Sequence, residues 1–221
     1  MLKIYAIGDI HGCSRTFNSL LIKELKINKR DKVYCLGDYI DRGPDSKGVI
    51  DIILDLRRKG YQIHTLRGNH EQMFMDSINN KQEFQKWINN GGNFTMKSFN
   101  IQSYKDLSPQ YKQFFRNTKY YIHKNNFLFV HAGFNVDNEN IFEDKQFMLW
   151  KRGFSLNNNE LYMKRIIHGH TPISINSIIN SAKTQVINID NGCVFKKYKY
   201  LGSLVAINLT ENIIIKTRNI D

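Results

Sequence analysis

Three short apolar segments of the chain each end in a glycine-containing cluster of charged or polar residues. The segments are LKIYAI, KVYCL and QIHTL, and the clusters that follow them are GDIHG, GDYIDRG and RGNHE. Between them lie stretches with apolar residues at helical spacing, which predict helices that connect three strands. Strands that alternate with helices favour a parallel sheet with right-handed crossovers, whose C-terminal strand ends meet along one edge. The polar clusters are therefore expected to lie side by side.

The connecting helices have predictable boundaries. Ser14 is expected to cap the first helix, which carries apolar residues at helical spacing from Phe17 to Leu25. The second helix begins at Pro44 to Ser46, runs through KGVIDIILDLRRK and has Gly60 just past its end. Residues 71–117 are polar with helical spacing, and NNGGN at 89–93 interrupts them. The first half of the chain is therefore expected to be three strands and several helices.

The second half of the chain has a different pattern. YYIH and FLFVH, separated by KNN, predict a hairpin, and TEN predicts a tight turn. RIIHGHTP, TQVINID, YLGSLVAINL and NIIIKTR predict further short strands in an antiparallel meander. Parallel units followed by antiparallel strands predict an α/β fold. We expect two packed mixed β-sheets, a β-sandwich flanked by helices, in a single domain that spans residues 1–221.

The composition is that of an ordinary globular protein, with 41% apolar and 12% aromatic residues. No apolar run approaches the roughly 20 residues that span a bilayer. The opening MLKIYAIGDI is too short, and too soon interrupted by Asp9, for a signal peptide. Three cysteines without CxxC spacing indicate neither a disulfide framework nor a zinc knuckle. We expect a cytoplasmic monomer with no membrane partner.

The net charge of +12 and the pI of about 9.5 are compatible with a polyanionic partner. The lysines are scattered, however. The densest patch, KKYKY at 196–200, alternates with period two, which an exposed strand explains more simply than a nucleic-acid surface. Nucleic acid is not expected as a partner. A basic nucleic-acid-binding protein with a vestigial site remains the alternative from a different functional class.

The polar residues at the strand ends include the side chains that bind transition metals. They are Asp9 and His11 in GDIHG, Asp38 in GDYIDRG, Asn69 in GNHE, His131 in VHAG and His170 in HGHTP. Mixed Asp, His and Asn ligands suit manganese, iron or zinc better than calcium or magnesium. Asp38 ends the middle strand of the three and is best placed to bridge two ions about 3.5–4 Å apart. The expected cofactors are two divalent ions, manganese first, with iron or zinc as alternatives.

Other residues of these clusters complete a site for phosphoryl transfer. Two metals at that separation bind a hydroxide between them, which favours direct attack on phosphorus. Arg42 offers a planar fork for phosphate, and Arg152 in LWKRG is a second candidate. His70 is placed to act as the general acid for the leaving group, with Asp41 orienting it. Any one cluster is more often a simple turn, but five of them at strand ends favour a catalytic site.

With these motifs in place, the chain resembles the calcineurin-like metallophosphoesterases, close to the bacterial and phage serine/threonine phosphoprotein phosphatases. The matching motifs are GDIHG, GDYIDRG, GNHE, HAG and HGH, between Gly8 and His170. The resemblance implies the calcineurin-like metallophosphoesterase fold. It also implies two ligand sets, which are Asp9, His11 and Asp38 for one metal, and Asp38, Asn69, His131 and His170 for the other. The residues implied to contact phosphate are Arg42, Asn69 and Arg152.

Two substrate classes remain open, a phosphoprotein and a nucleotide phosphoester. The intact DRGPDS favours a manganese-dependent serine/threonine protein phosphatase. WINNGGNFTMKSF and INIDNGCVF also resemble segments of the symmetrical dinucleoside tetraphosphatases, so hydrolysis of diadenosine tetraphosphate is the alternative. A nucleotide hydrolase needs a slot for the base, for which Trp87, Phe94 and Phe134 are candidates. Pro172 stands where broader diesterases carry a further metal-binding histidine, which argues against a general phosphodiesterase.

Overall fold

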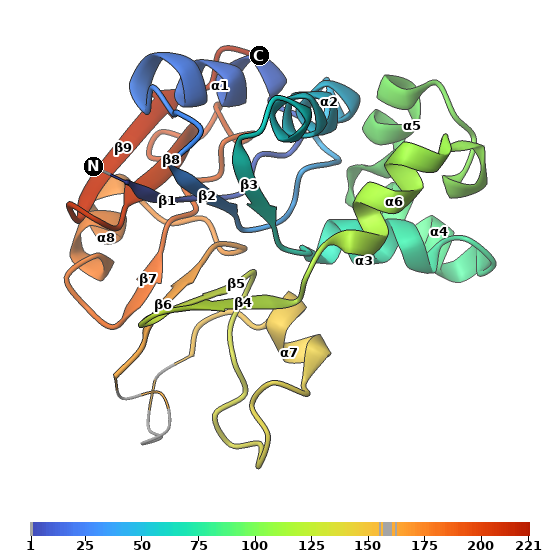
Figure 1. Cartoon of the computed structure of the whole chain (residues 1–221). Helices are drawn as coiled ribbons and strands as arrows, with labels where there is room; N and C mark the ends of the chain where they lie inside the picture. The colour runs from blue at the N-terminus through green and yellow to red at the C-terminus, as the bar shows by residue number, and fades with distance from the viewer. Residues whose placement is uncertain (1, 155, 157–160, 162) are drawn as a thin grey trace.

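The computed structural model describes residues 2–154, 156, 161 and 163–221, and its strands form two sheets that face each other (Figure 1). The five-stranded sheet has the order β3-β2-β1-β8-β9 and the four-stranded sheet the order β4-β5-β6-β7. Their bounds are β1 (Ile4–Ile7), β2 (Lys32–Cys35), β3 (Gln62–Thr65), β4 (Tyr121–Lys124), β5 (Phe127–Val130), β6 (Arg165–His168), β7 (Val186–Asn188), β8 (Ser203–Asn208) and β9 (Ile213–Arg218).

Helices flank these sheets and form a separate group beside β3 (Figure 1). None of the described helices is long and apolar enough to cross a membrane. The α-helices are α1 (Ser14–Ser19), α2 (Ser46–Arg58), α3 (Asn69–Asp76), α4 (Lys81–Trp87), α5 (Asn93–Phe99), α6 (Pro109–Asn117), α7 (Lys145–Trp150) and α8 (Ile175–Ser181). Shorter helical turns are η1 (Leu20–Glu24), η2 (Ile88–Gly92) and η3 (Tyr104–Asp106).

The strand pairing confirms two packed mixed sheets. β1, β2 and β3 are parallel, as predicted, and β8 and β9 join them antiparallel. In the second sheet, β4 and β5 form the predicted hairpin. The prediction of an antiparallel meander was wrong for β6 and β7, which continue parallel from β5. The reason is that α7 lies between β5 and β6 and α8 between β6 and β7, and each parallel pair requires such a crossover connection.

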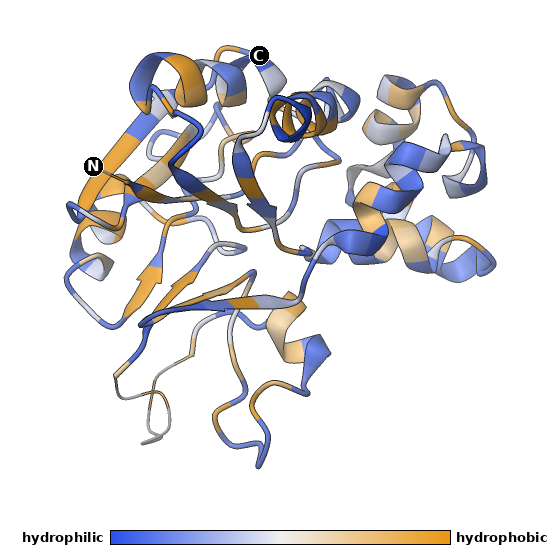
Figure 2. Cartoon of the chain, viewed as in Figure 1, coloured by the Kyte–Doolittle hydropathy of each residue, from blue (hydrophilic) through white to orange (hydrophobic). Residues whose placement is uncertain are grey.

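Side chains alternate along the strands and so build three apolar layers. In β2 and the residue after it, Val33 and Cys35 face the helices, whereas Tyr34 and Leu36 face the other sheet. The layer between the sheets is closed by Tyr34 stacked on Phe129, with ring centroids 4.1 Å apart. The third layer lies on the outer face of the second sheet. Figure 2 shows the matching pattern around α1 and α2, which carry apolar and polar residues on different sides.

Local predictions about helix ends and turns had mixed outcomes. Gly60 follows α2 with φ of 86°, as predicted for the residue after a helix end. Ser14 is the first residue of α1 and not its cap, because its hydroxyl donates to Asp45 and Cys13 holds the N-cap position. The KKYKY segment at 196–200 forms turns, so the predicted exposed strand was wrong.

Candidate functional site

The turns that follow the strands adopt a backbone conformation that side chains rarely take. His11, Asp38, Asp41, Arg42 and His170 have positive φ values of 45°, 50°, 70°, 66° and 67°. They are five of the nine non-glycine residues with positive φ in the described part of the chain. Left-handed backbone at non-glycine residues is strained and concentrates at functional sites. These turns follow β1, β2 and β6, and they direct side chains from both sheets towards one place.

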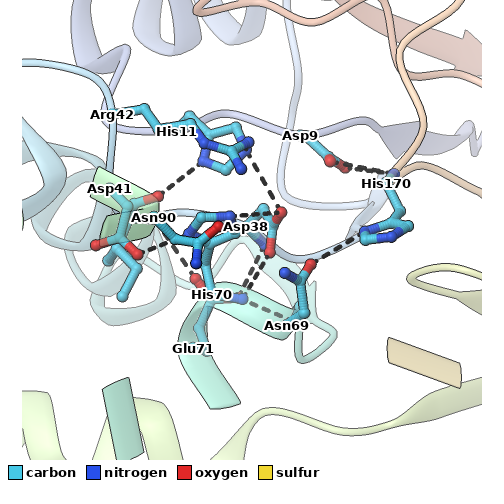
Figure 3. Close-up of polar contacts among 12 residues, drawn as sticks. Asp9, His11, Asp38, Asp41, Arg42, Asn69, His70, Glu71, Asn90 and His170 are labelled. Atoms are coloured by element: carbon cyan, nitrogen blue, oxygen red, sulfur yellow. Dashed lines mark hydrogen bonds and ion pairs between the residues drawn. The ribbon is translucent and has the colours of Figure 1, made fainter. Parts of the chain in front are cut away.

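Asp38 lies at the centre of this place (Figure 3). Its Oδ2 is 3.4 Å from His11 Nε2 and 4.0 Å from His70 Nε2, and its Oδ1 is 3.6 Å from His131 Nε2. Burial by itself raises the pKa of this carboxyl, but the histidines around it lower the pKa to well below the usual range. Asp38 is therefore an ionised carboxylate with both oxygens directed at imidazole nitrogens.

The same kind of hydrogen bond orients His11 and His131 so that the Nε2 atom of each lies near the Asp38 carboxylate. His11 Nδ1 donates to the carbonyl of Ile40 at 2.9 Å, and His131 Nδ1 donates to the carbonyl of Leu36 at 3.0 Å. Burial lowers the pKa of both imidazoles, so both are neutral and each Nε2 carries a lone pair. The Arg42 guanidinium donates to His11 Nε2 at 2.9 Å.

A second group comes from α3 and the four-stranded sheet. Asn69 Oδ1 is 2.9 Å from His131 Nε2 and 3.0 Å from His170 Nδ1, and the two imidazole nitrogens are 3.1 Å apart. Burial, with His131 nearby, lowers the pKa of His170 to about 3. His170 Nε2 is buried and has no hydrogen-bond partner among the described residues. The group therefore consists of neutral nitrogen and oxygen donors that converge.

Asp9 approaches the site from β1. Its two carboxylate oxygens accept the backbone N–H of His170 at 3.2 and 3.1 Å, and Oδ1 lies 4.0 Å from His131 Nδ1. Burial raises the pKa of Asp9, as do the nearby carboxylates of Asp190 and Asp38. A buried carboxylate with such neighbours is stabilised by a cation, because burying negative charge without one is costly.

The donor set fits divalent transition metals. Possible ligand atoms form two groups, and within each group all of these atoms lie within 4.8 Å of one another. The first group comes from His11, Asp38 and His70, and the second from Asp38, His131 and His170. Asp38 belongs to both. The first group differs from the predicted set, because His70 stands in it where Asp9 was expected. A glycine is needed beside this carboxylate, since a Cβ on Gly68 would lie 2.0 Å from Asp38 Oδ1.

His70 and Asp41 form a buried hydrogen-bonded pair. His70 Nδ1 donates to Asp41 Oδ2 at 2.7 Å, and both side chains are almost fully buried. Burial lowers the pKa of His70, but the carboxylates of Asp38 and Asp41 outweigh it and raise that pKa above its ordinary value. His70 Nε2 is buried and has no hydrogen-bond partner among the described residues. The pair has the geometry of an oriented proton donor.

A cavity of about 210 Å³ opens onto these groups and contains both arginines. The Arg42 guanidinium lies over the Phe195 ring at 5.6 Å, and Arg152 reaches the cavity from an exposed position. Asp9, His11, Asp41 and His131 are buried and do not line the cavity. The lining residues are Asp38, Arg42, Asn69, His70, Asn90, Trp150, Arg152, His170, Pro172 and Phe195.

None of the three aromatic residues that the sequence offered for a base-binding slot lines this cavity. Trp87 and Phe134 are completely buried in the core, and Phe94 does not line the cavity. Trp150 and Phe195 are the aromatic residues that do. Neither residue follows a strand directly, so the pattern of polar clusters at strand ends, which located the proposed metal ligands, did not indicate them.

Sequence reasoning also missed Glu71, the last residue of GNHE. Its carboxylate accepts the backbone N–H of Asp38, Tyr39 and Gly68 at 2.8, 2.8 and 2.9 Å. Burial and the Asp38 carboxylate raise the pKa of Glu71 to about 8, against these hydrogen bonds. Glu71 thereby holds the turn that carries Asp38. A charged residue directly after Asn69 and His70 was the available signal.

Comparisons with known proteins give the family. The sequence model of the calcineurin-like phosphoesterases matches residues 2–198 of this chain. Serine/threonine-protein phosphatase 1 of Salmonella typhimurium is 37% identical over 95 residues, which cover 41% of this chain and 39% of that protein. A symmetrical bis(5'-nucleosyl)-tetraphosphatase of Buchnera aphidicola is 41% identical over 70 residues, which cover 32% of this chain and 24% of that protein. Both matches thus span less than half of these relatives.

Two further matches cover most of the chain. An asymmetrical bis(5'-nucleosyl)-tetraphosphatase of Oceanobacillus iheyensis is 26% identical over 219 residues, which cover 88% of this chain and 85% of that protein. The solved structure of a protein serine/threonine phosphatase from Saccharomyces cerevisiae has a TM-score of 0.62 at 17% identity and covers 100% of this chain and 81% of that one. At that identity the structural match concerns the fold.

Proposed function

Because this chain belongs to the calcineurin-like phosphoesterase family, a family of metal-dependent phosphoric ester hydrolases, we propose that it is a serine/threonine protein phosphatase with two divalent metal ions. Manganese is the first choice of metal, with iron or zinc as alternatives. The observation that carries the proposal is the position of Asp38, whose carboxylate belongs to two groups of histidine ligands at once. We place the protein in the cytoplasm, where its three free, buried cysteines remain reduced.

The convergence of these side chains and the family support a set of proposed ligand roles. Asp9, His11 and Asp38 would hold the first metal. Asp38, Asn69, His131 and His170 would hold the second. When bound, the metals would activate water for direct attack on phosphorus and neutralise charge on the phosphate oxygens. We assign His70 to the acid role and not to the ligands, because its Nδ1 donates to the Asp41 carboxylate, whereas the Nδ1 atoms of His11 and His131 donate to backbone carbonyls.

The remaining side chains bind phosphate and protonate the leaving group. Arg42 and Arg152 would each donate N–H groups to phosphate oxygens, since both line the cavity above Asp38 and Asn69. His70 would pass its Nε2 proton to the ester oxygen as the bond from phosphorus to that oxygen breaks. Its Nδ1–H would stay hydrogen-bonded to the Asp41 carboxylate, which stabilises the imidazolium before the Nε2 proton is transferred.

The substrate class is the finer part of the proposal. The intact Asp41-Arg42 pair and the similarity to the Salmonella phosphatase support a phosphoprotein. One observation favours the alternative, a symmetrical bis(5'-nucleosyl)-tetraphosphatase that hydrolyses diadenosine tetraphosphate. Trp150 and Phe195 line the cavity beside the arginines, and aromatic rings next to cations suit a nucleobase and its phosphates.

The deciding experiment compares kcat/KM of the manganese-loaded protein on a phosphothreonine peptide and on diadenosine tetraphosphate. A large preference for the peptide is expected. A preference for the dinucleotide, with ADP as the product, would overturn the protein phosphatase and establish the alternative. Phe195→Leu is the matched variant, because loss of the ring should lower kcat/KM on the dinucleotide only if a base stacks there.

A further inference from the structure

The segment that joins α4 to α5 contacts the site, and none of its residues is among the proposed ligands of metal or phosphate. It begins at Trp87, passes through η2 and reaches Thr95 in the first turn of α5. Both residues are completely buried, and Asn90 between them lines the cavity. Buried polar groups need hydrogen-bond partners, so the partners of Trp87 and Thr95 reveal what the segment does.

Both side chains donate to the Asp41 carboxylate. Trp87 Nε1 lies 2.9 Å from Oδ2 and 3.1 Å from Oδ1, and Thr95 Oγ1 lies 2.6 Å from Oδ1. With the bond from His70, the carboxylate has three side-chain donors from α3, α4 and α5. Rotation of the carboxylate towards any other partner would break at least one of these bonds, so its orientation is fixed.

Thr95 also fixes the backbone that carries this carboxylate. Its Oγ1 accepts the backbone N–H of Asp41 at 2.9 Å, in addition to donating to the side chain. The Ser46 hydroxyl lies 3.1 Å from both the Asp41 nitrogen and Thr95 Oγ1. Asp41 has φ of 70°, and such a strained residue keeps its conformation only where surrounding contacts impose it. A hydroxyl at position 95 does this, since it both accepts and donates.

The same segment holds Arg42, the other proposed functional residue of this turn. The Arg42 backbone N–H donates to the carbonyl of Gly91 at 3.3 Å. Gly91 has φ of 103°, and a Cβ there would lie 2.9 Å from Arg42 Cγ. The close approach of the two backbones therefore needs glycine.

We propose that Trp87 and Thr95 are positioning residues that hold Asp41 so that His70 Nε2 faces the leaving group. The inference rests on the proposed role of His70 as the acid. His70 Nδ1 lies 2.7 Å from Asp41 Oδ2, so the imidazole follows any displacement of the carboxylate. A positioning role is specific to proton donation, whereas a merely structural role would alter all substrates alike.

The test uses a pair of substrates that differ in their need for an acid. Phenyl phosphate has a poor leaving group that needs protonation, and 2,4-dinitrophenyl phosphate has a good one that does not. Because general acid catalysis contributes about 10²–10⁴-fold, we expect Thr95→Val to lower kcat on phenyl phosphate roughly tenfold to a hundredfold. The same variant should change kcat on 2,4-dinitrophenyl phosphate, and KM on either ester, by less than about twofold.

Two controls separate positioning from packing. Thr95→Ser keeps the hydroxyl and should restore kcat on phenyl phosphate. Thr16→Val makes the same chemical change at another completely buried threonine, whose hydroxyl likewise donates to a carboxylate, that of Asp221, and should show no split between the esters. Equal losses on both esters, or no loss on phenyl phosphate, would overturn the proposal. Trp87→Phe removes the indole N–H and provides the same test if Thr95→Val does not fold.

A second measurement does not depend on turnover. The Nδ1–H proton of His70 should give a downfield NMR signal in the zinc-loaded protein, protected from exchange by Asp41. We expect the signal in the wild type and in Thr95→Ser, and its loss or shift in Thr95→Val. An unchanged signal in Thr95→Val would contradict the positioning role. A wild type that hydrolyses neither ester with manganese, iron or zinc would instead refute the proposed function, and the signal would still decide the role of Thr95.

Discussion

Asp38 is the residue on which most of the proposed chemistry depends. Its carboxylate faces His11 and His70 with one oxygen and His131 with the other, while Glu71 holds its backbone N–H. A carboxylate in this position can hold two ions close together without either ion needing a full set of its own anionic ligands. Substitution of Asp38 is therefore expected to affect both ions, whereas substitution of a ligand on one side of it is expected to affect one ion.

Asp38→Ala is expected to abolish metal binding at both positions, because both ligand groups contain this carboxylate. Metal content after gel filtration, measured by mass spectrometry, should fall from two ions per chain to none. Asp9→Ala and His170→Ala are the matched variants, and each should lose one ion. Retention of two ions by Asp38→Ala would remove the bridging role.

His70→Asn is expected to keep both metals and to lose about 10²–10⁴-fold in kcat on phenyl phosphate, since the acid is removed. Turnover of 2,4-dinitrophenyl phosphate should fall far less. His123→Asn serves as the control, because that histidine is exposed on β4 and its Nε2 is hydrogen-bonded to the carbonyl of Asn125 in the hairpin turn. Wild-type rates on phenyl phosphate would end the acid role of His70.

Arg42→Ala is expected to raise KM for phosphate esters roughly tenfold to a hundredfold, because a hydrogen bond to a charged group contributes about 1.5–3 kcal/mol. Arg58→Ala removes an exposed guanidinium on α2, where it pairs with Asp55, and should leave KM unchanged. Initial-rate kinetics at saturating metal measure both. An unchanged KM in Arg42→Ala would mean that phosphate binds elsewhere.

At the scale of elements, α2 is held at its start by Asp45. The Asp45 carboxylate accepts the backbone N–H of Gly48 at 2.8 Å and the hydroxyl of Ser14 at 2.6 Å, so it joins α2 to α1. Asp45→Ala is expected to lower the free energy of unfolding by about 1–2 kcal/mol, as loss of a helix cap does. Urea denaturation followed by circular dichroism measures this. Asp55→Ala, on the exposed side of α2, should change the midpoint little, and equal effects would refute the cap.

The elements also show how far the sequence predicts the site. Gly-Asp directly after two apolar segments, and Arg-Gly-Asn after the third, are local patterns, so the strand ends and their polar residues were predictable. Trp87 and Thr95 contact Asp41 across 46 and 54 residues of chain, and no spacing rule connects them. β7 is parallel to β6 because α8 forms a crossover between them. The polar residues around HGHTP do not indicate that such a helix follows. Long-range contacts are thus what the sequence alone leaves open.

At the scale of the whole molecule, the proposed ligands come from both sheets. Asp9 and Asp38 follow strands of the five-stranded sheet, whereas His131 and His170 follow β5 and β6 of the other. Figure 1 shows the two sheets meeting face to face. We propose that residues 1–221 form one cooperative domain, since the strands of both sheets share the apolar layer between them. Metal that bridges the sheets would then stabilise the entire fold.

Addition of manganese is therefore expected to raise Tm in a single unfolding transition. At a hundredfold excess over Kd, binding to the folded state alone adds about 2.7 kcal/mol, which corresponds to roughly 5–10 °C for a chain of this size. Differential scanning calorimetry with and without a chelator measures the shift, and Asp38→Ala provides the control that should not respond. Two separate transitions, only one of them sensitive to manganese, would contradict a single domain.

The left-handed backbone at five site residues has a consequence for evolution in the laboratory. Glycine adopts positive φ without the strain that His11, Asp38, Asp41, Arg42 and His170 carry, so glycine at these positions relieves strain of about 1–3 kcal/mol each. Selection for thermal stability alone would therefore favour removal of the side chains that we propose take part in the chemistry. Stability and turnover are opposed at these positions, and only selection that scores both would preserve the enzyme while strengthening the fold.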